Sequence, residues 1–166
     1  MTLNSRLGVE RIVSGGQTGV DRGALEAAIE LGIAHGGWCP SGRLAEDGPI
    51  DARYNLQETN ERDYAVRTER NVIDSDGTLI LYQVRLSGGT LLTNRLAKRH
   101  GKPLFRVRID RTADLNAIAQ WISEHQVSVL NVAGPRESSQ PGIQQRAKEL
   151  VIKLFGCGAT LLATEE

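Results

Sequence analysis

The sequence has few cysteines, no net charge and no long apolar run. Cys39 and Cys157 are its only cysteines, and no CxxC pair or Cys/His cluster with zinc spacing occurs, so we expect no protein-ligated metal. Twenty basic residues balance twenty acidic ones, which gives no reason to expect nucleic acid or a membrane surface as a partner. No stretch approaches the ~18 apolar residues of a membrane span.

The N-terminal segment 1–9 has neither the apolar core nor the small-residue cleavage site of a signal peptide, so the chain is predicted to be cytoplasmic. Its 166 residues, 40% hydrophobic and 24% charged, suit one globular domain with a real core. We expect a single domain over 1–166, with 1–9 as a frayed lead-in, because no linker or internal repeat divides the chain.

The stretch from Ile12 to Leu25 organises the chain. It is typical of the end of a buried strand, a glycine-rich turn and the start of a helix. Apolar residues then recur three or four positions apart along one helical face, at Val20, Ala24, Ala27, Ala28 and Leu31.

The glycine-rich turn, Gly15-Gly16-Gln17-Thr18-Gly19, suits an anion. Glycines let a ligand approach the backbone, and unpaired N–H groups at a helix start attract negative charge. Thr18 adds a hydroxyl donor, and Asp21 and Arg22 follow in the first turn of the helix. The turn matches neither G-x-x-x-x-G-K-[ST] nor G-x-G-x-x-G. A tight strand-to-helix turn without a ligand is the alternative.

Strands and helices alternate along the rest of the chain, which predicts an α/β fold. We expect a Rossmann-like three-layer αβα sandwich with a mainly parallel sheet. The predicted strands are 10–14, 33–38, 78–82, 104–109 and 127–133, with an edge strand at 159–163, and the predicted helices are 20–31, 62–74, 90–100, 112–125 and 140–155.

Three turns of small residues follow predicted strands, at 14–19, 87–90 and 134–138. In a doubly wound sheet, the carboxyl ends of the strands share one edge. These turns should therefore converge there, together with the long loop 39–50, and form a binding site.

Six motifs resemble those of the molybdenum cofactor carrier proteins. They are Gly15 to Leu25; Gly37-Trp38-Cys39-Pro40-Ser41-Gly42-Arg43 with Ala45-Glu46-Asp47-Gly48; Arg67 to Val72; Ser75 to Thr78; Gly88-Gly89-Thr90; and Ala133 to Ser138. The resemblance covers about residues 10–155. The family belongs to a wider Rossmann-like group with the phosphoribohydrolases often called lysine decarboxylases.

The resemblance implies homo-oligomers that bind molybdopterin, or a related phosphate-bearing ligand, with molybdoenzymes as possible recipients. Backbone N–H groups and arginines would hold the anionic parts, and carboxylates would accept from the pterin N–H groups. The candidate binding residues are Gly15, Gly16, Gln17, Thr18, Gly19, Asp21, Arg22, Arg43, Glu46, Asp47, Arg67, Ser87, Gly88, Gly89, Thr90, Arg136, Glu137 and Ser138.

Several of these candidates also have structural interpretations. Arg43, Glu46 and Asp47 would then be solvated loop charges, and Arg67 would pair along its own helix with Asp63 or Asn71. Arg136 and Glu137 would cap the following helix, and Cys39 would be a small buried residue at a strand end.

An enzyme and a nucleotide-sensing module are the alternatives to a carrier. The related phosphoribohydrolases carry P-G-G-x-G-T-x-x-E, whereas this chain has Ser87-Gly88-Gly89-Thr90, with Thr93 at the position of the glutamate. Glycosidic cleavage relies on carboxylates, and a threonine cannot replace one. The sequence therefore favours a binding protein and identifies no catalytic residue.

Overall fold

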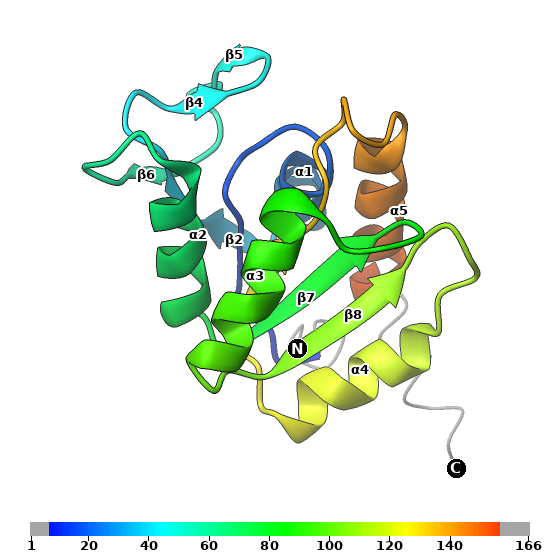
Figure 1. The fold of residues 1–166 in the computed structure, drawn as a ribbon. Helices are drawn as coiled ribbons and strands as arrows, with labels where there is room; N and C mark the ends of the chain where they lie inside the picture. The colour runs from blue at the N-terminus through cyan, green and yellow to red at the C-terminus, as the bar shows by residue number, and fades with distance from the viewer. Residues whose placement is uncertain (1–6, 157–166) are drawn as a thin grey trace.

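The computed structural model describes residues 7–156, and its centre is a five-stranded parallel sheet (Figure 1). The strand order is β2-β1-β9-β7-β8, and every neighbouring pair is parallel. The strands are β1 (Arg11–Val13), β2 (Ala34–Gly36), β7 (Gly77–Tyr82), β8 (Leu104–Arg108) and β9 (Val129–Ala133). The predicted parallel sheet is confirmed, and the predicted edge strand at 159–163 lies outside the described residues.

Five helices cover the two faces of the sheet. They are α1 (Val20–Leu31), α2 (Tyr64–Ile73), α3 (Gly88–Arg99), α4 (Leu115–Glu124) and α5 (Ile143–Gly156). Buried residues of α1, α4 and α5 share one hydrophobic cluster with the sheet, whereas α2 and α3 pack together through a second cluster that contains Val72, Leu96 and Ala97. The result is the expected three-layer αβα sandwich.

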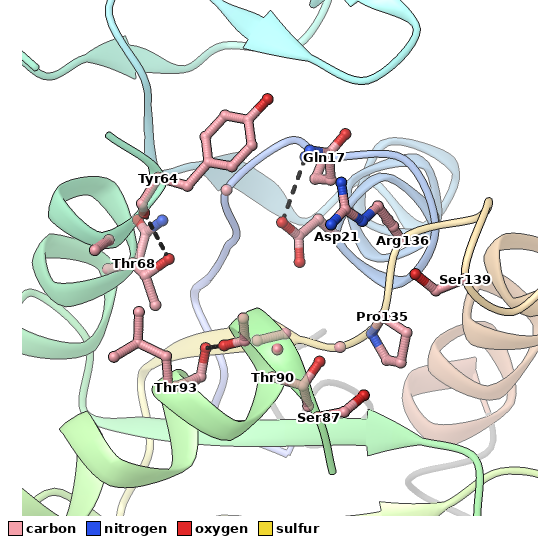
Figure 2. A pocket seen from close by; sticks show the side chains of 18 of the residues that line it. Gln17, Asp21, Tyr64, Thr68, Ser87, Thr90, Thr93, Pro135, Arg136 and Ser139 are labelled. Carbon is pink, nitrogen blue, oxygen red and sulfur yellow. Dashed lines mark hydrogen bonds between the residues drawn. The ribbon is translucent and has the colours of Figure 1, made fainter. Parts of the chain in front are cut away.

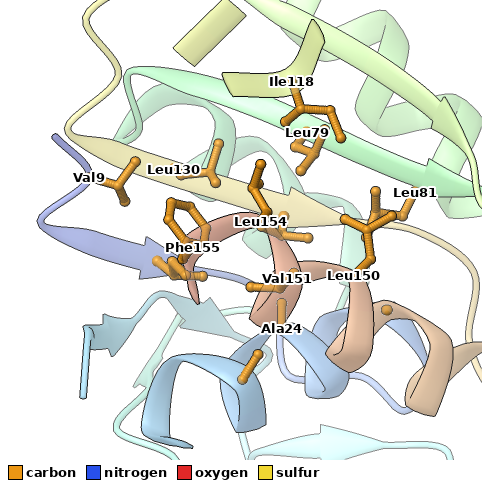
Figure 3. Packing of buried hydrophobic residues seen from close by; sticks show 14 of the residues in the cluster. Val9, Ala24, Leu79, Leu81, Ile118, Leu130, Leu150, Val151, Leu154 and Phe155 are labelled. Carbon is orange, nitrogen blue, oxygen red and sulfur yellow. The ribbon is translucent and has the colours of Figure 1, made fainter. Parts of the chain in front are cut away.

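The main core lies between the sheet and α5. Leu150, Val151 and Leu154 of α5 point toward the strands that carry Leu79 and Leu130 (Figure 3). Leu150 and Val151 precede Leu154 by four and three residues, so the three side chains share one buried face of the helix. The core also contains Val9, which is 1% exposed and lies just before β1 in the chain. The lead-in predicted over 1–9 is therefore wrong at Val9.

The predicted second strand, 33–38, is broken at Gly37. Gly37 has φ +125°, and a Cβ there would lie 2.3 Å from the carbonyl oxygen of Ser14. The chain leaves the sheet at this point, so Trp38 and Cys39 (β3, Trp38–Cys39) pair with β6 (Gln57–Glu58) instead. The loop predicted at 39–50 contains a small antiparallel hairpin of β4 (Leu44–Ala45) and β5 (Gly48–Pro49).

The connections of the sheet reverse direction around β9. Strand β1 continues through α1 to β2 on one side, and β7 continues through α3 to β8 on the other. The segments after β1, β7 and β9 therefore leave the same edge of the sheet with a crevice between them. Open α/β sheets bind their ligands at such a reversal.

Candidate ligand-binding site

A pocket lies at this reversal of strand order (Figure 2). Its walls come from the segments after β1, β7 and β9, from the first turns of α3, and from the face of α2 that carries Tyr64, Thr68 and Asn71. Its cavity volume is about 200 Å³, and the cavity opens to solvent. A partly open cleft lined by several polar groups is a common form of small-molecule site.

Half of the predicted candidates line this pocket. They are Gly15, Gln17, Asp21, Arg67, Ser87, Gly88, Gly89, Thr90 and Arg136. The other candidates, which do not line it, are Gly16, Thr18, Gly19, Arg22, Arg43, Glu46, Asp47, Glu137 and Ser138. The turns 14–19, 87–90 and 134–138 thus each contribute to the pocket, whereas the loop 39–50 does not.

The N-terminus of α3 is open toward the pocket. Ser87, at the N-cap position, makes no side-chain capping bond, and Gly88 and Gly89 have no hydrogen-bond partner for their N–H groups among residues 7–156. A Cβ on either glycine would meet nothing within 4 Å. By contrast, Asp114 caps α4 through a 3.0 Å bond from the N–H of Ala117. The free N–H groups and the helix dipole make the start of α3 a seat for an anion.

The charged side chains of the pocket are three arginines and one carboxylate. Arg67 comes from α2, Arg85 from the β7–α3 segment, and Arg136 from the segment after β9. Arg67 is 7% exposed, and its Nη1 donates to the carbonyl oxygen of Gly15 at 2.6 Å. The predicted pairing of Arg67 along its own helix is therefore not observed. The pocket attracts anions on balance.

Asp21 is the carboxylate of this pocket. Burial raises the pKa of its carboxyl to about 6, against the opposing charge of Arg67. Its Oδ2 accepts a 3.4 Å hydrogen bond from the N–H of Gln17, and no described side chain donates to it. Figure 2 shows the carboxylate pointing into the space between the first loop and α3.

The loop after β1 differs from the predicted phosphate cradle, because side chains of the loop and of α5 accept from its N–H groups. The N–H of Thr18 bonds to the side-chain oxygen of Gln17 at 3.1 Å, and that of Gly19 bonds to the side-chain oxygen of Gln144 at 3.0 Å. Gly19 is required for packing, since a Cβ there would lie 2.2 Å from the carbonyl oxygen of Pro135. The geometry therefore favours the start of α3 over this loop for an anion.

Arg43 is a structural residue. Its guanidinium donates to the backbone carbonyl oxygens of Ile50, Asp51, Tyr54 and Leu56 at 2.8–3.3 Å. These bonds satisfy carbonyl groups of a segment with little regular structure. Arg43 does not line the pocket, and its donors hold the loop 50–56 in place.

Glu46 and Asp47 tie the β4–β5 hairpin to the pocket loops. Glu46 accepts hydrogen bonds from the Thr18 hydroxyl and from Ser138, whose Oγ lies 2.5 Å from Oε2. These bonds lower the pKa of Glu46, and the bond from the Ser138 side chain has the largest effect. Asp47 pairs with Arg22, whose Nη2 donates to Oδ1 at 3.1 Å. All five residues form a clamp between loops instead of facing a ligand.

Glu137 caps helix α5. Its two carboxylate oxygens accept from the N–H groups of Gly142 at 2.7 Å and Gln144 at 3.0 Å. A carboxylate in this position satisfies donors that a helix start leaves free. The capping interpretation is confirmed for Glu137, whereas Arg136 lines the pocket.

Arg85, Asn131 and Thr93 line the pocket although they were not candidates. Asn131 is 3% exposed and interrupts the apolar run of β9. A polar residue in a buried strand can indicate a binding site, so the sequence could have identified Asn131. Arg85 precedes the glycines of α3 by a few residues. Thr93 donates to the carbonyl oxygen of Gly89 at 3.0 Å, so its hydroxyl stabilises the first turn of α3.

Residues 7–156 contain no group of three or more His, Cys, Asp or Glu side chains arranged to hold a metal ion. None of the helices in this range has the length and apolarity needed to cross a bilayer. Cys39 is buried at the end of β3, next to Ile50 and Leu56.

Comparison with known proteins identifies the family. A model of the circularly permutated YpsA SLOG family matches residues 12–155, which include every segment that lines the pocket. The chain belongs to this family. None of the curated proteins is significantly similar to the chain.

A solved structure is also similar to this chain. It is that of a protein from Syntrophus aciditrophicus SB, provisionally named a molybdenum carrier protein. The two sequences are 43% identical, the match covers 89% of this chain and 95% of that one, and the TM-score is 0.84. The resemblance seen in the sequence motifs is thereby confirmed.

Proposed function

We propose that this protein binds molybdopterin, or a related phosphate-bearing ligand, in the pocket and serves as a carrier for the molybdenum cofactor. The observation that carries the proposal is the open start of α3, where the N–H groups of Gly88 and Gly89 have no partner among residues 7–156 and face a pocket that three arginines line. The name of the Syntrophus aciditrophicus protein, which is similar over most of its length, supports the molybdenum part of the proposal.

The pocket suits the chemistry of this ligand. Molybdopterin has a terminal phosphate and a polar heterocycle, and its own dithiolene holds the metal. The start of α3, together with Arg85 and Arg136, would take the phosphate through charge-assisted hydrogen bonds. The protein then needs no metal ligand of its own, because the metal is part of the cargo.

Small molecules released from the purified protein test this proposal. We would purify the wild type and Gly89→Asp in parallel without oxygen and identify the released molecules by mass spectrometry. A Cβ fits at Gly89 without contact, so the variant should fold, but its carboxylate would occupy the anion seat. Gly89→Asn is the matched neutral control.

A molybdopterin-type phosphate should be released by the wild type and Gly89→Asn but not by Gly89→Asp. Equal amounts from all three proteins would contradict a phosphate seat at α3. Release of an adenine nucleotide instead would favour the sensor or hydrolase alternatives.

A phosphoribohydrolase is the enzymatic alternative. Thr93 replaces the glutamate of those hydrolases, but Asp21 supplies a carboxyl group in the pocket. Its pKa of about 6 suits proton transfer near neutral pH. In that reaction, water would add to the anomeric carbon of a nucleoside monophosphate and the base would leave with a proton. We expect no free adenine from AMP above a heat-treated control. Steady release that disappears in Asp21→Asn would replace the carrier with a hydrolase.

The proposal includes one domain that forms homo-oligomers and passes its ligand to molybdoenzymes. The single domain is expected from the length of the chain and from the absence of a linker, and the other two parts rest on the family resemblance. Light scattering of the purified protein measures its assembly, and a single mass equal to the 18.1 kDa chain would contradict the oligomer.

A further inference from the structure

The pocket contains a carboxylate that the phosphate seat does not use. Asp21 lies on the first turn of α1, is 7% exposed and points into the cavity (Figure 2). It makes no ion pair among the described residues, because the guanidinium of Arg67 donates to the carbonyl of Gly15 and that of Arg22 to Asp47 and the carbonyl of Gly16. The N–H of Gln17 donates to its Oδ2 at 3.4 Å, and the backbone N–H of Gly15 also stabilises the charged carboxylate.

A buried carboxylate without an ion pair is costly unless donors reach it. Arg67 and Arg22 stabilise its charge from a distance, and the backbone N–H groups of Gln17 and Gly15 stabilise it from the loop. No side chain of residues 7–156 donates to it, so further donors come from the cavity side, as water or as a ligand. Asp21 therefore has both the position and the free acceptor capacity to recognise a ligand that donates hydrogen bonds.

The other carboxylates expected to recognise a ligand are already used. Glu46 is bonded to Thr18 and Ser138, Asp47 to Arg22, and Glu137 caps α5. None of these three lines the pocket. Within residues 7–156, Asp21 is the only carboxylate that faces the proposed ligand.

We infer that Asp21 is the specificity-determining residue of the pocket and accepts the paired N–H donors of a 2-amino-4-oxopyrimidine edge. This inference rests on the proposed function, because the phosphate of the same ligand would occupy the start of α3. The 2-amino group and the adjacent ring N–H are parallel donors that match the two oxygens of a carboxylate. Pterins and guanine share this edge.

A ligand without this edge leaves Asp21 unsatisfied. A 2,4-dioxo ring places a carbonyl oxygen where the 2-amino group would be, and that oxygen faces the carboxylate oxygen at close range. Adenine offers a ring nitrogen acceptor next to its amino group. Both arrangements leave a buried charge partly unpaired, so each should bind less tightly.

Pterin and lumazine, its 2,4-dioxo counterpart, provide a direct test. We would titrate each fluorescent ring at pH 7 into the wild type, Asp21→Asn and Asp114→Asn, in the presence of inorganic phosphate. The wild type and Asp114→Asn, a control at the N-cap of α4, should prefer pterin by about tenfold. Asparagine offers one donor and one acceptor, so Asp21→Asn should lose this preference or reverse it toward lumazine.

GMP and AMP form the second arm and distinguish purine from pterin ligands. A preference for GMP over AMP that exceeds the preference for pterin over lumazine would indicate that Asp21 recognises a guanine ring. Equal binding of pterin and lumazine by the wild type, or a pterin preference that persists in Asp21→Asn, would overturn the inference. Equal binding of the two rings by the wild type overturns the inference even if the variant fails to fold.

Binding of inorganic phosphate alone, measured by calorimetry on the wild type and Gly89→Asp, separates the two proposals. Phosphate binding that Gly89→Asp abolishes, combined with no preference between the rings, overturns only the role of Asp21. Absence of phosphate binding in the wild type contradicts the proposed function itself.

Discussion

Arg67 of α2 donates a 2.6 Å hydrogen bond to the carbonyl oxygen of Gly15, and this bond links two segments 52 residues apart in the sequence. The guanidinium also lies 5.1 Å from the centre of the Tyr64 ring. The bond fixes the loop after β1 against α2, so one wall of the pocket depends on a single buried arginine.

Alanine at Gly15 and at Gly19 should have different consequences. At Gly15, a Cβ would lie 2.5 Å from Nη1 of Arg67, a flexible side chain that can move away. At Gly19, with φ +86°, it would lie 2.2 Å from the backbone oxygen of Pro135. We expect Gly15→Ala to cost about 1 kcal/mol of unfolding free energy and Gly19→Ala about 3 kcal/mol or more.

Urea unfolding and ligand titration check this pair. Gly15→Ala should reduce ligand affinity by about tenfold while keeping its fold, since Arg67 has to leave the pocket wall. A Gly15→Ala protein that is as unstable as Gly19→Ala would show that the Arg67 bond is mainly structural.

Removal of the Arg136 side chain should weaken ligand binding with little effect on stability. Arg136 is exposed at the pocket and joins no ion pair among the described residues. Loss of a charge-assisted contact should cost roughly 1.5–3 kcal/mol of binding free energy, whereas the unfolding free energy should change by less than about 0.5 kcal/mol. Arg111→Ala, at an exposed arginine outside the pocket, is the control, and an unfolded Arg136→Ala protein would contradict a binding role.

Asp21 should make the fold less stable as pH rises from acid to neutral. Burial raises its pKa from 3.8 to about 6, so the folded state holds the proton more tightly than the unfolded state. The stabilisation is fully present below pH ~4 and is lost as pH rises through about 6. A shift of this size corresponds to at most about 3 kcal/mol.

Unfolding free energies of the wild type and Asp21→Asn between pH 4 and pH 7 measure this effect. From pH 7 to pH 4, the unfolding free energy of the wild type should rise by about 2 kcal/mol relative to that of Asp21→Asn. The unfolding free energy of the wild type relative to Asp47→Asn should not rise toward low pH, because the hydrogen bond from Arg22 lowers the pKa of Asp47. If the unfolding free energy of the wild type relative to Asp21→Asn does not change with pH, the Asp21 carboxyl is well solvated through the pocket.

The sheet could be predicted from the sequence because its signals are local. The run from Gly77 to Tyr82 is almost entirely apolar and forms the buried strand β7. The open helix start at Gly88 and Gly89 was also predictable, since free N–H groups are a property of any helix start. The rest of the site depends on contacts that the local sequence does not reveal.

Arg43 and Glu46 illustrate this limit. Both lie in a loop rich in glycine and proline, where charged residues are equally compatible with a ligand contact or a structural role. Glu46 bonds to Thr18 and Ser138, 28 and 92 residues away, so only the fold assigns it to a clamp. Asp21 was recognised as a candidate, but its place as the carboxylate of the pocket follows from the geometry alone.

The central claim is that the start of α3 holds the phosphate of the ligand. Calorimetric titration of molybdopterin, without oxygen, into the wild type, Gly89→Asn and Gly89→Asp tests it most directly. Similar affinity for the first two proteins and a loss of at least about 100-fold in Gly89→Asp, with unchanged thermal unfolding, is the predicted result. Equal affinity of all three proteins for molybdopterin would contradict the account.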